Sequence, residues 1–285
     1  MSLVGYLFTN LYMGIGIAAD VYAATLGSFH EFTDDKYRRN WVWRNTLTHT
    51  VFPLVGMYMV VVGIAVWRPL QSALFLFGAV LLGFFLRHLV RGKSGVDCAD
   101  DAFKQDEKGI LAKVIQRVEK IDPQWALVLG VSVDAINSGF AKAADTREWP
   151  LHLLLLSFPL VGCVVGAGAF AGGQKAKWFL SFMRKQSSGN VTVLARRLSK
   201  LAFGAFLVEL FVLGYFFWRS VANIFVPFGV PEWIDSRLVA WGVSGVTSVI
   251  ILFFYAEDIV RNTDEEAMRS FAKGRKKTCG ISKHH

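Results

Sequence analysis

Long apolar runs alternate with short polar segments along most of the chain. A helix needs about 20 mainly apolar residues to cross the hydrocarbon core of a bilayer, and a window of that length finds seven such runs. They cover residues 3–27, 47–67, 72–89, 125–144, 151–172, 201–218 and 238–256. The pattern predicts an all-α polytopic membrane protein with seven transmembrane helices.

Composition supports this class and excludes several others. Of the 285 residues, 53% are hydrophobic and only 19% are charged. A disordered chain, a collagen, a coiled coil or a disulfide-rich miniprotein would need more charge, more Gly/Pro periodicity, heptads or more cysteine. The sequence shows no phosphate-binding loop and no Cys/His zinc spacing, so we expect neither an enzyme nor a nucleic-acid binder.

The basic residues are distributed unevenly between the two ends of the predicted helices. The net charge is +9, and 26 of the 31 Lys and Arg residues belong to one side of the membrane, against five on the other. Cytoplasmic segments are richer in Lys and Arg. We therefore expect a multi-pass protein of the cytoplasmic (inner) membrane, with the N-terminus outside, the C-terminus in the cytoplasm and the lipid bilayer as its partner.

An internal repeat is visible in the order of the apolar runs. The first and fourth predicted helices contain Asp20 and Asp134, and the second and fifth share the pentapeptide Phe-Pro-Leu-Val-Gly at residues 52–56 and 158–162. Because each copy has three helices, an odd number, the second copy must enter the membrane from the opposite side. The sequence thus predicts two inverted three-helix repeats plus one extra C-terminal helix.

These features divide the chain into five segments. Apolar residues at helical spacing in the loop after the third helix predict an amphipathic helix on the inner leaflet. The segments are residues 1–91, the first repeat; 92–122, a cytoplasmic loop with that helix; 123–219, the second repeat; 220–258, the extra transmembrane helix; and 259–285, a cytoplasmic tail.

Polar residues inside the apolar runs are the candidates for function. An ionised side chain in hydrocarbon costs several kcal/mol, so Asp20 and Asp134 each need a partner. Inverted symmetry would bring them to equivalent positions, where two carboxylates repel unless a cation or a proton lies between them. This predicts a cation site, and the alternative is that each aspartate forms a structural hydrogen bond.

Three more side chains could complete such a site. His49 lies one turn before Pro53, which frees backbone carbonyls and places an imidazole beside them. Asn137 lies one turn after Asp134 and offers an amide oxygen, while Glu209 is central in the sixth predicted helix as a third ligand or a proton carrier. The alternative for each is a structural hydrogen bond to backbone, water or a neighbouring helix.

Short motifs give the chain a resemblance to a known family. Asp20 begins Asp-Val-Tyr-Ala-Ala-Thr-Leu-Gly, Pro53 begins Pro-Leu-Val-Gly, residues 87–92 close the third helix, and Ser-Val-Asp-Ala surrounds Asp134. Together they resemble the MntP-type manganese exporters of the LysE transporter superfamily. The resemblance implies an inverted-repeat exporter of the bacterial inner membrane in which Asp20 and Asp134 bind the ion.

His49 departs from that family, which usually has a glutamate four residues before the proline of the second helix. Imidazole is a softer ligand than carboxylate and would shift the preference from Mn toward Fe, Co, Ni or Zn. We therefore expect a secondary transporter that exports a divalent transition-metal ion by alternating access. The ion is cargo, and no cofactor is expected.

Two alternatives remain open from the sequence. An exporter of an amino acid or another small organic solute would need a helix end or a basic side chain for a carboxylate, and no Lys or Arg lies in the middle of a predicted helix. A seven-helix receptor or sensor is the other alternative, although its retinal-binding form would need a lysine that residues 238–256 lack. The sequence leaves open the direction of transport, the coupling ion and whether the protein forms a homo-oligomer.

Overall fold

The computed structural model describes four long stretches of the chain and several short pieces between them. The long stretches are residues 3–66, 149–185, 191–225 and 236–281. The short pieces are residues 76, 79–80, 122, 124–125, 128–129, 132, 135–136, 138–139, 142–143, 231 and 234.

Every regular element among the described residues is helical. The elements are α1 (Leu3–Gly27), a short 3₁₀ helix η1 (Phe29–Glu31), α2 (Asp35–Val66), α7 (Leu151–Lys185), α8 (Val191–Phe225) and α9 (Arg237–Ile281). Five of them are long and apolar enough to cross a membrane, namely α1, α2, α7, α8 and α9. This confirms, for the described residues, a helical protein whose long helices are apolar enough to span a membrane. The predicted helices at 72–89, 110–121 and 125–144 lie wholly or largely outside the described residues, so the count of seven and the repeats stay predictions.

Four of the helices extend beyond the apolar runs that predicted them. The clearest case is α9, which continues to Ile281 through most of the segment expected to be a separate tail. The apolar run did not predict this extension, because an apolar window ends at the first charges, whereas Glu, Ala, Met, Arg and Lys continue a helix readily. The apolar run at 238–256 and most of the predicted tail therefore lie on one helix.

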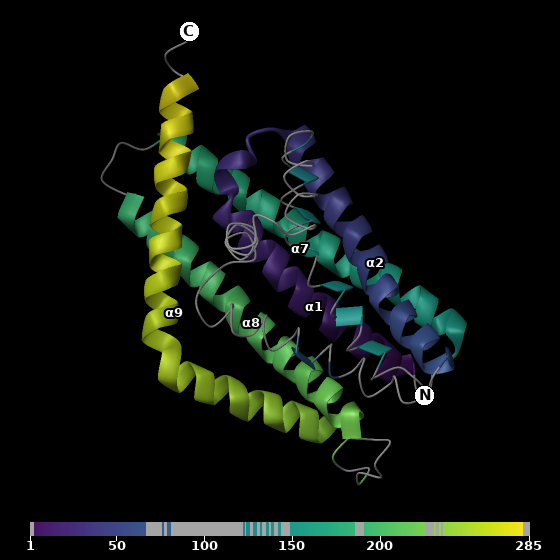
Figure 1. Cartoon of the computed structure of the whole chain (residues 1–285). Helices are drawn as coiled ribbons and strands as arrows, with labels where there is room; N and C mark the ends of the chain where they lie inside the picture. The colour runs from purple at the N-terminus through teal and green to yellow at the C-terminus, as the bar shows by residue number, and fades with distance from the viewer. Residues whose placement is uncertain are drawn as a thin grey trace, which may run out of the picture.

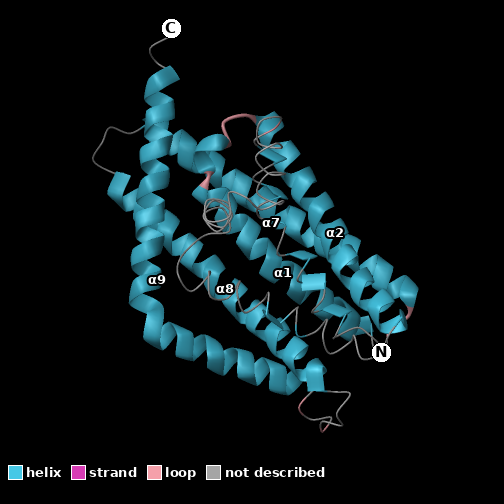
Figure 2. Cartoon of the chain, in the orientation of Figure 1, coloured by secondary structure: helices cyan, strands magenta, loops and turns pink. Residues whose placement is uncertain are grey.

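The helices pack side by side with α1 in the middle (Figures 1 and 2). One side of α1 contacts α7 and the other contacts α8, while α2 packs on α7 and α9 packs mainly on α8. Part-way along its length α9 bends, so that its two parts run in different directions (Figure 1). This order makes the α1–α7 and α1–α8 contacts the interior of the described bundle.

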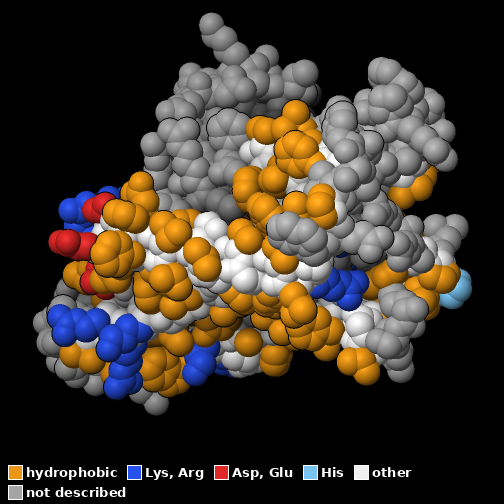
Figure 3. Space-filling model, turned by 90° about the horizontal axis from the view of Figure 1, so that it is seen from below, with side chains coloured by type: hydrophobic (Ala, Val, Ile, Leu, Met, Phe, Trp, Pro, Cys, Tyr) orange, Lys and Arg blue, Asp and Glu red, His pale blue; other side chains and the backbone are white. Residues whose placement is uncertain are grey.

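The exposed charges gather where α1 and α7 end and where α2 and α8 begin. We call this the basic end; its exposed basic residues include Lys36, Arg39, Lys175, Lys177, Arg196, Arg197 and Lys200. In Figure 3 charged side chains gather mainly at one end of the visible face, whereas apolar side chains cover much of the rest. An apolar belt with a charged end is the surface that a membrane-spanning bundle needs.

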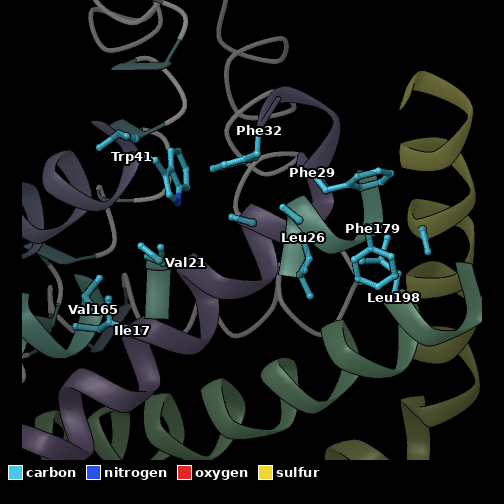
Figure 4. Packing of buried hydrophobic residues seen from close by; sticks show 14 of the residues in the cluster. Ile17, Val21, Leu26, Phe29, Phe32, Trp41, Val165, Phe179 and Leu198 are labelled. Carbon is cyan, nitrogen blue, oxygen red and sulfur yellow. The ribbon is translucent and has the colours of Figure 1, made fainter. Parts of the chain in front are cut away.

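Aromatic rings close the core at the basic end (Figure 4). Phe29 of η1 lies 6.0 Å from Phe179 of α7 and 4.9 Å from Phe271 of α9, measured between ring centroids. Nearby, the indole N–H of Trp41 donates a 2.9 Å hydrogen bond to the Thr25 hydroxyl and so joins α2 to α1. These contacts fix the ends of the helices that carry the candidate site.

Candidate functional site

Asp20 is a buried carboxylate on α1. The residue is 4% exposed, and its Oδ2 has no hydrogen-bond partner among the described residues. Placing an ionised Asp at the centre of a membrane helix costs roughly 2.5–3.5 kcal/mol on insertion scales. A bound cation or a proton would remove that cost, so the burial of Asp20 fits the predicted role.

Glu209 lies on the facing side of α8 at the same level. Along the antiparallel α1–α8 contact, the rings of Tyr12 and Phe216 lie 6.3 Å apart, and one turn further Gly16 packs directly on Val212. One more turn along α1 reaches Asp20, and the matching turn back along α8 reaches Glu209. Glu209 is also only 4% exposed, so the register brings two of the predicted site residues to one level of one interface.

His49 has a ring orientation suited to metal ligation. The residue is fully buried, and its Nδ1 lies 2.9 Å from the backbone oxygen of Asn45, with the Thr48 and Ser132 hydroxyls at 3.3 and 3.5 Å. A carbonyl oxygen can only accept, so Nδ1 carries the proton and Nε2 keeps a lone pair. Nε2 has no hydrogen-bond partner among the described residues. Metal-ligating histidines usually donate their second ring N–H to a carbonyl or carboxylate in this way.

The depth of Asp20 in the bundle can be measured along α7, which runs parallel to α1. Gly168 of α7 packs against Ala18 of α1. Asp20 is two residues further in the same direction, which makes it level with about position 170 of α7.

The depth of His49 follows from the other side of α7. Gly162 contacts Thr50 of α2, and the two helices are antiparallel, so His49 is level with about position 163. The seven residues between the two levels correspond to about 10 Å along the helix axis at 1.5 Å per residue. Metal–ligand bonds are only about 2.0–2.3 Å long, so one ion cannot touch both His49 and Asp20 in this conformation.

Two of the five predicted ligands, Asp134 and Asn137, lie outside the described residues. Within the part of the chain that the structure describes, no group of three or more His, Cys, Asp or Glu side chains could hold a metal ion. The structure therefore places Asp20 and Glu209 at one level of the α1–α8 interface and separates Asp20 from His49, while the predicted meeting of Asp20 and Asp134 stays a prediction.

Lys142 is a functional candidate that the sequence reasoning missed. The residue is fully buried, its ammonium donates a 2.6 Å hydrogen bond to Oδ1 of Asn10, and it lies 4.4 Å from the centroid of the Phe158 ring. From the sequence it counted as one of the few basic residues at the outer boundary, and no basic residue was expected inside. The sequence signal for its burial was that it lies inside the apolar run at 125–144, two residues before the end of that run.

Arg44 and Asp122 form an ion pair at the basic end. Nη2 of Arg44 lies 2.6 Å from Oδ2 of Asp122, and the guanidinium lies 4.7 Å from the centroid of the Trp125 ring. The hydrogen bond from Arg44 lowers the pKa of the Asp122 carboxyl below its usual value. Oδ1 of Asp122 also accepts a 2.9 Å hydrogen bond from the backbone N–H of Gln124, which is an N-cap interaction. The pair thus ties α2 to the start of the residues predicted as the fourth helix.

The contact between α2 and α7 has a register that relates the two identical pentapeptides. Gly162 contacts Thr50, and one turn further along α7 Gly166 contacts Thr46, one turn back along α2. Extending the same register by three residues in the opposite direction makes Pro159 level with Pro53. An inverted repeat about a two-fold axis between these helices would place equivalent residues at the same level.

No known protein family, curated protein or solved structure matches the chain. The likeness to MntP-type exporters therefore rests on the motifs of the sequence, and membership of that family stays a prediction.

Proposed function

We propose that the protein is a secondary transporter that exports a divalent transition-metal ion across the cytoplasmic membrane by alternating access. The observation that carries the proposal is the burial of Asp20 and Glu209 at one level of the α1–α8 interface. Intramembrane carboxylates are costly, and they commonly mark an ion or proton pathway. In the proposal the N-terminus lies outside, and the basic end, like the C-terminus, lies in the cytoplasm.

The two carboxylates have complementary roles in this proposal. Oδ2 of Asp20 is the ligand that the ion meets first from the basic end, and Glu209 either shares the ion or takes the proton that is exchanged for it. Hard oxygen ligands bind every divalent metal of the first row, so this pair alone gives little selectivity.

His49 supplies selectivity at a second ion-binding position, which lies about 10 Å further from the basic end than Asp20. Its Nε2 lone pair favours borderline ions such as Fe, Co, Ni and Zn over Mn. Asp134 and Asn137 lie outside the described residues, and in the proposal they remain ligands of the ion, Asp134 together with Asp20, as the repeat predicts.

The common level of Pro53 and Pro159 in the α2–α7 contact supports an inverted repeat. Exchange of two inverted repeats between their conformations is a general way to open one site to either side of the membrane in turn. Breaks in the helical hydrogen bonds at the two prolines would let the central helices bend.

The proposal is tested by metal tolerance of cells and by metal flux into proteoliposomes. Export raises tolerance, whereas import would lower it. We expect Asp20→Asn and Glu209→Gln to reduce flux on the order of tenfold or more, since even outer-shell partners of a metal commonly contribute tenfold. The matched control is Asp258→Asn, which changes a half-exposed aspartate of α9 paired with Arg261.

The variant His49→Gln tests the second ion-binding position independently of the first. We expect it to reduce the flux of Co, Ni and Zn more than that of Mn, because only the nitrogen ligand is lost. The site assignment is wrong if Asp20→Asn and Glu209→Gln, at wild-type protein levels, both carry every divalent metal at the wild-type rate.

Lys142 favours a second candidate function, export of an amino acid or another organic anion. A buried ammonium can bind the carboxylate of such a solute, and this is the group that the sequence alone did not provide. Binding of an amino acid by the purified wild-type protein but not by Lys142→Met, together with no response to divalent metals, would establish this function in place of metal export.

A further inference from the structure

A groove runs between α2 and α7 at the basic end, on the outside of the described bundle. It has a volume of about 470 Å³, within the usual range of about 300–1,000 Å³ for small-molecule sites. Its apolar wall includes Val42, Trp43 and Phe170, and its polar rim includes Arg38 and Arg39. Trp43 and Phe170 are 64% and 57% exposed, so the apolar wall is open to the surroundings.

The groove straddles the boundary between hydrocarbon and water. The apolar run of α7 ends at residue 172 and that of α2 begins at residue 47, so the apolar wall lies within a turn or so of these limits, whereas Arg38 and Arg39 lie two turns or more before the run of α2. An exposed tryptophan at this level is typical of the interface, where its ring contacts acyl chains near the headgroups. The ligand must therefore have an apolar part as well as a polar head.

Basic side chains outnumber acidic ones at the rim. Asp35 forms an ion pair with Arg38 and lies 3.6 Å from the ammonium of Lys177. Arg38 also donates a 2.9 Å hydrogen bond to the backbone oxygen of Phe32, which holds its side chain in place. Arg39 is exposed and forms no ion pair with any described residue. Three cations around one carboxylate leave the rim with a net positive charge that would attract an anion.

The geometry points to a binding site for an anionic phospholipid of the inner leaflet. Its phosphate lies against Arg39 and Arg38, and one acyl chain follows the wall formed by Trp43 and Phe170. Basic pockets between transmembrane helices on the cytoplasmic side recognise anionic headgroups by this combination. A free phosphate would pair with the arginines of the rim but would leave the aromatic wall without a contact.

The test is native mass spectrometry of the full-length protein in mild detergent, titrated with phosphatidylglycerol or with phosphatidylcholine. We expect one molecule of phosphatidylglycerol to bind saturably, and sn-glycerol 1-phosphate at millimolar concentration not to displace it. Phosphatidylcholine should bind more weakly. Arg39→Gln should weaken the binding of phosphatidylglycerol by about fivefold, the effect of one basic residue near a lipid headgroup.

Four further variants distinguish a groove from general attraction to a basic surface. A Cβ at Gly173 would lie 3.7 Å from Cδ of Arg38, an ordinary contact, so Gly173→Ala should bind lipid as the wild type does. Gly173→Leu fills the groove without changing its charge and should prevent saturable binding. Lys200→Gln removes an exposed charge of α8 at the same end and should have no effect. Trp43→Ala, at an exposed position that leaves the core intact, should weaken binding if Gly173→Leu fails to fold.

The proposal is overturned if phosphatidylcholine binds equally well or if sn-glycerol 1-phosphate displaces the lipid. It is equally overturned if Arg39→Gln weakens binding while folded Gly173→Leu and Trp43→Ala leave it unchanged. These outcomes do not depend on metal transport, so the lipid site and the proposed function can fail separately.

Discussion

Removing the Asn10 side chain tests whether the buried ammonium of Lys142 depends on it. Asn10 is fully buried, and its Oδ1 accepts the 2.6 Å hydrogen bond from Nζ of Lys142. Leucine is similar in size, so Asn10→Leu removes the acceptor and leaves little cavity. A hydrogen bond to a charged group contributes about 1.5–3 kcal/mol. Its loss in a buried site leaves the cost of removing the ammonium from water less well compensated. We expect Asn10→Leu to lower the free energy of unfolding by about 2 kcal/mol.

The assay is thermal unfolding of the detergent-solubilised protein, followed by the fluorescence of its tryptophans. For a chain of this size, 1 kcal/mol corresponds to a change in Tm of about 2–4 °C, so a loss of about 2 kcal/mol should lower the Tm of Asn10→Leu by about 4–8 °C. Lys142→Met and the double variant complete a double-mutant cycle. The double variant should be more stable than the sum of the single losses by about 1.5–3 kcal/mol, because without the ammonium the acceptor is no longer needed.

Two results would refute this reasoning. One is an unchanged Tm in Asn10→Leu, which would mean that the Phe158 ring and the other surroundings of Lys142 stabilise the buried ammonium without Asn10. The other is additivity of the two single losses within about 0.5 kcal/mol, the behaviour of independent sites.

Two further predictions concern stability at other points of the bundle. Because the folded-state pKa of Asp122 is lowered, its ion pair with Arg44 stabilises the protein above the ordinary carboxyl pKa of about 3.9 and is lost as the pH falls through the lower folded value. The Tm difference between wild type and Asp122→Asn, worth about 1 kcal/mol at pH 7, should therefore shrink below about pH 4 in melts recorded from pH 7 to pH 3, and a constant difference would contradict the pairing. Gly16→Ala should lower the Tm because its methyl group would overlap Val212, at a cost of about 1–3 kcal/mol, whereas Gly204→Ala on the same pair of helices meets no atom within 4 Å and should raise the Tm slightly. Equal effects of the two alanines in the same melts would contradict the close α1–α8 contact.

Much of the fold was predictable because membrane insertion depends on local composition. Every apolar run that falls within the long described stretches is a helix, and α1 coincides with its predicted bounds. The ends of the other helices were not predictable from apolarity, since α9 continues through charged residues to Ile281. Hydrogen bonds and helix propensity determine where a helix stops, whereas apolarity determines only which part of it lies in hydrocarbon.

The candidate site was predictable residue by residue but not as an arrangement. Asp20, His49 and Glu209 were selected because polar groups in apolar helices are costly, and all three are buried. Their grouping depends on helix register, which the close packing of Gly16 on Val212 determines. Register is a property of two surfaces in contact, so no pattern within one helix could reveal it.

The sequence by itself determined which segments are apolar, which end of the bundle is basic and which few polar residues interrupt the apolar runs. Only the tertiary structure decided that Asp20 faces α8 at the level of Glu209, that His49 lies about 10 Å away along the axis, and that Lys142 is buried against Asn10 and Phe158. The physical reason is that hydropathy measures the preference of each side chain for water or hydrocarbon. Which partner a buried polar group meets depends on how two helices pack, through glycines and side chains far apart in the chain.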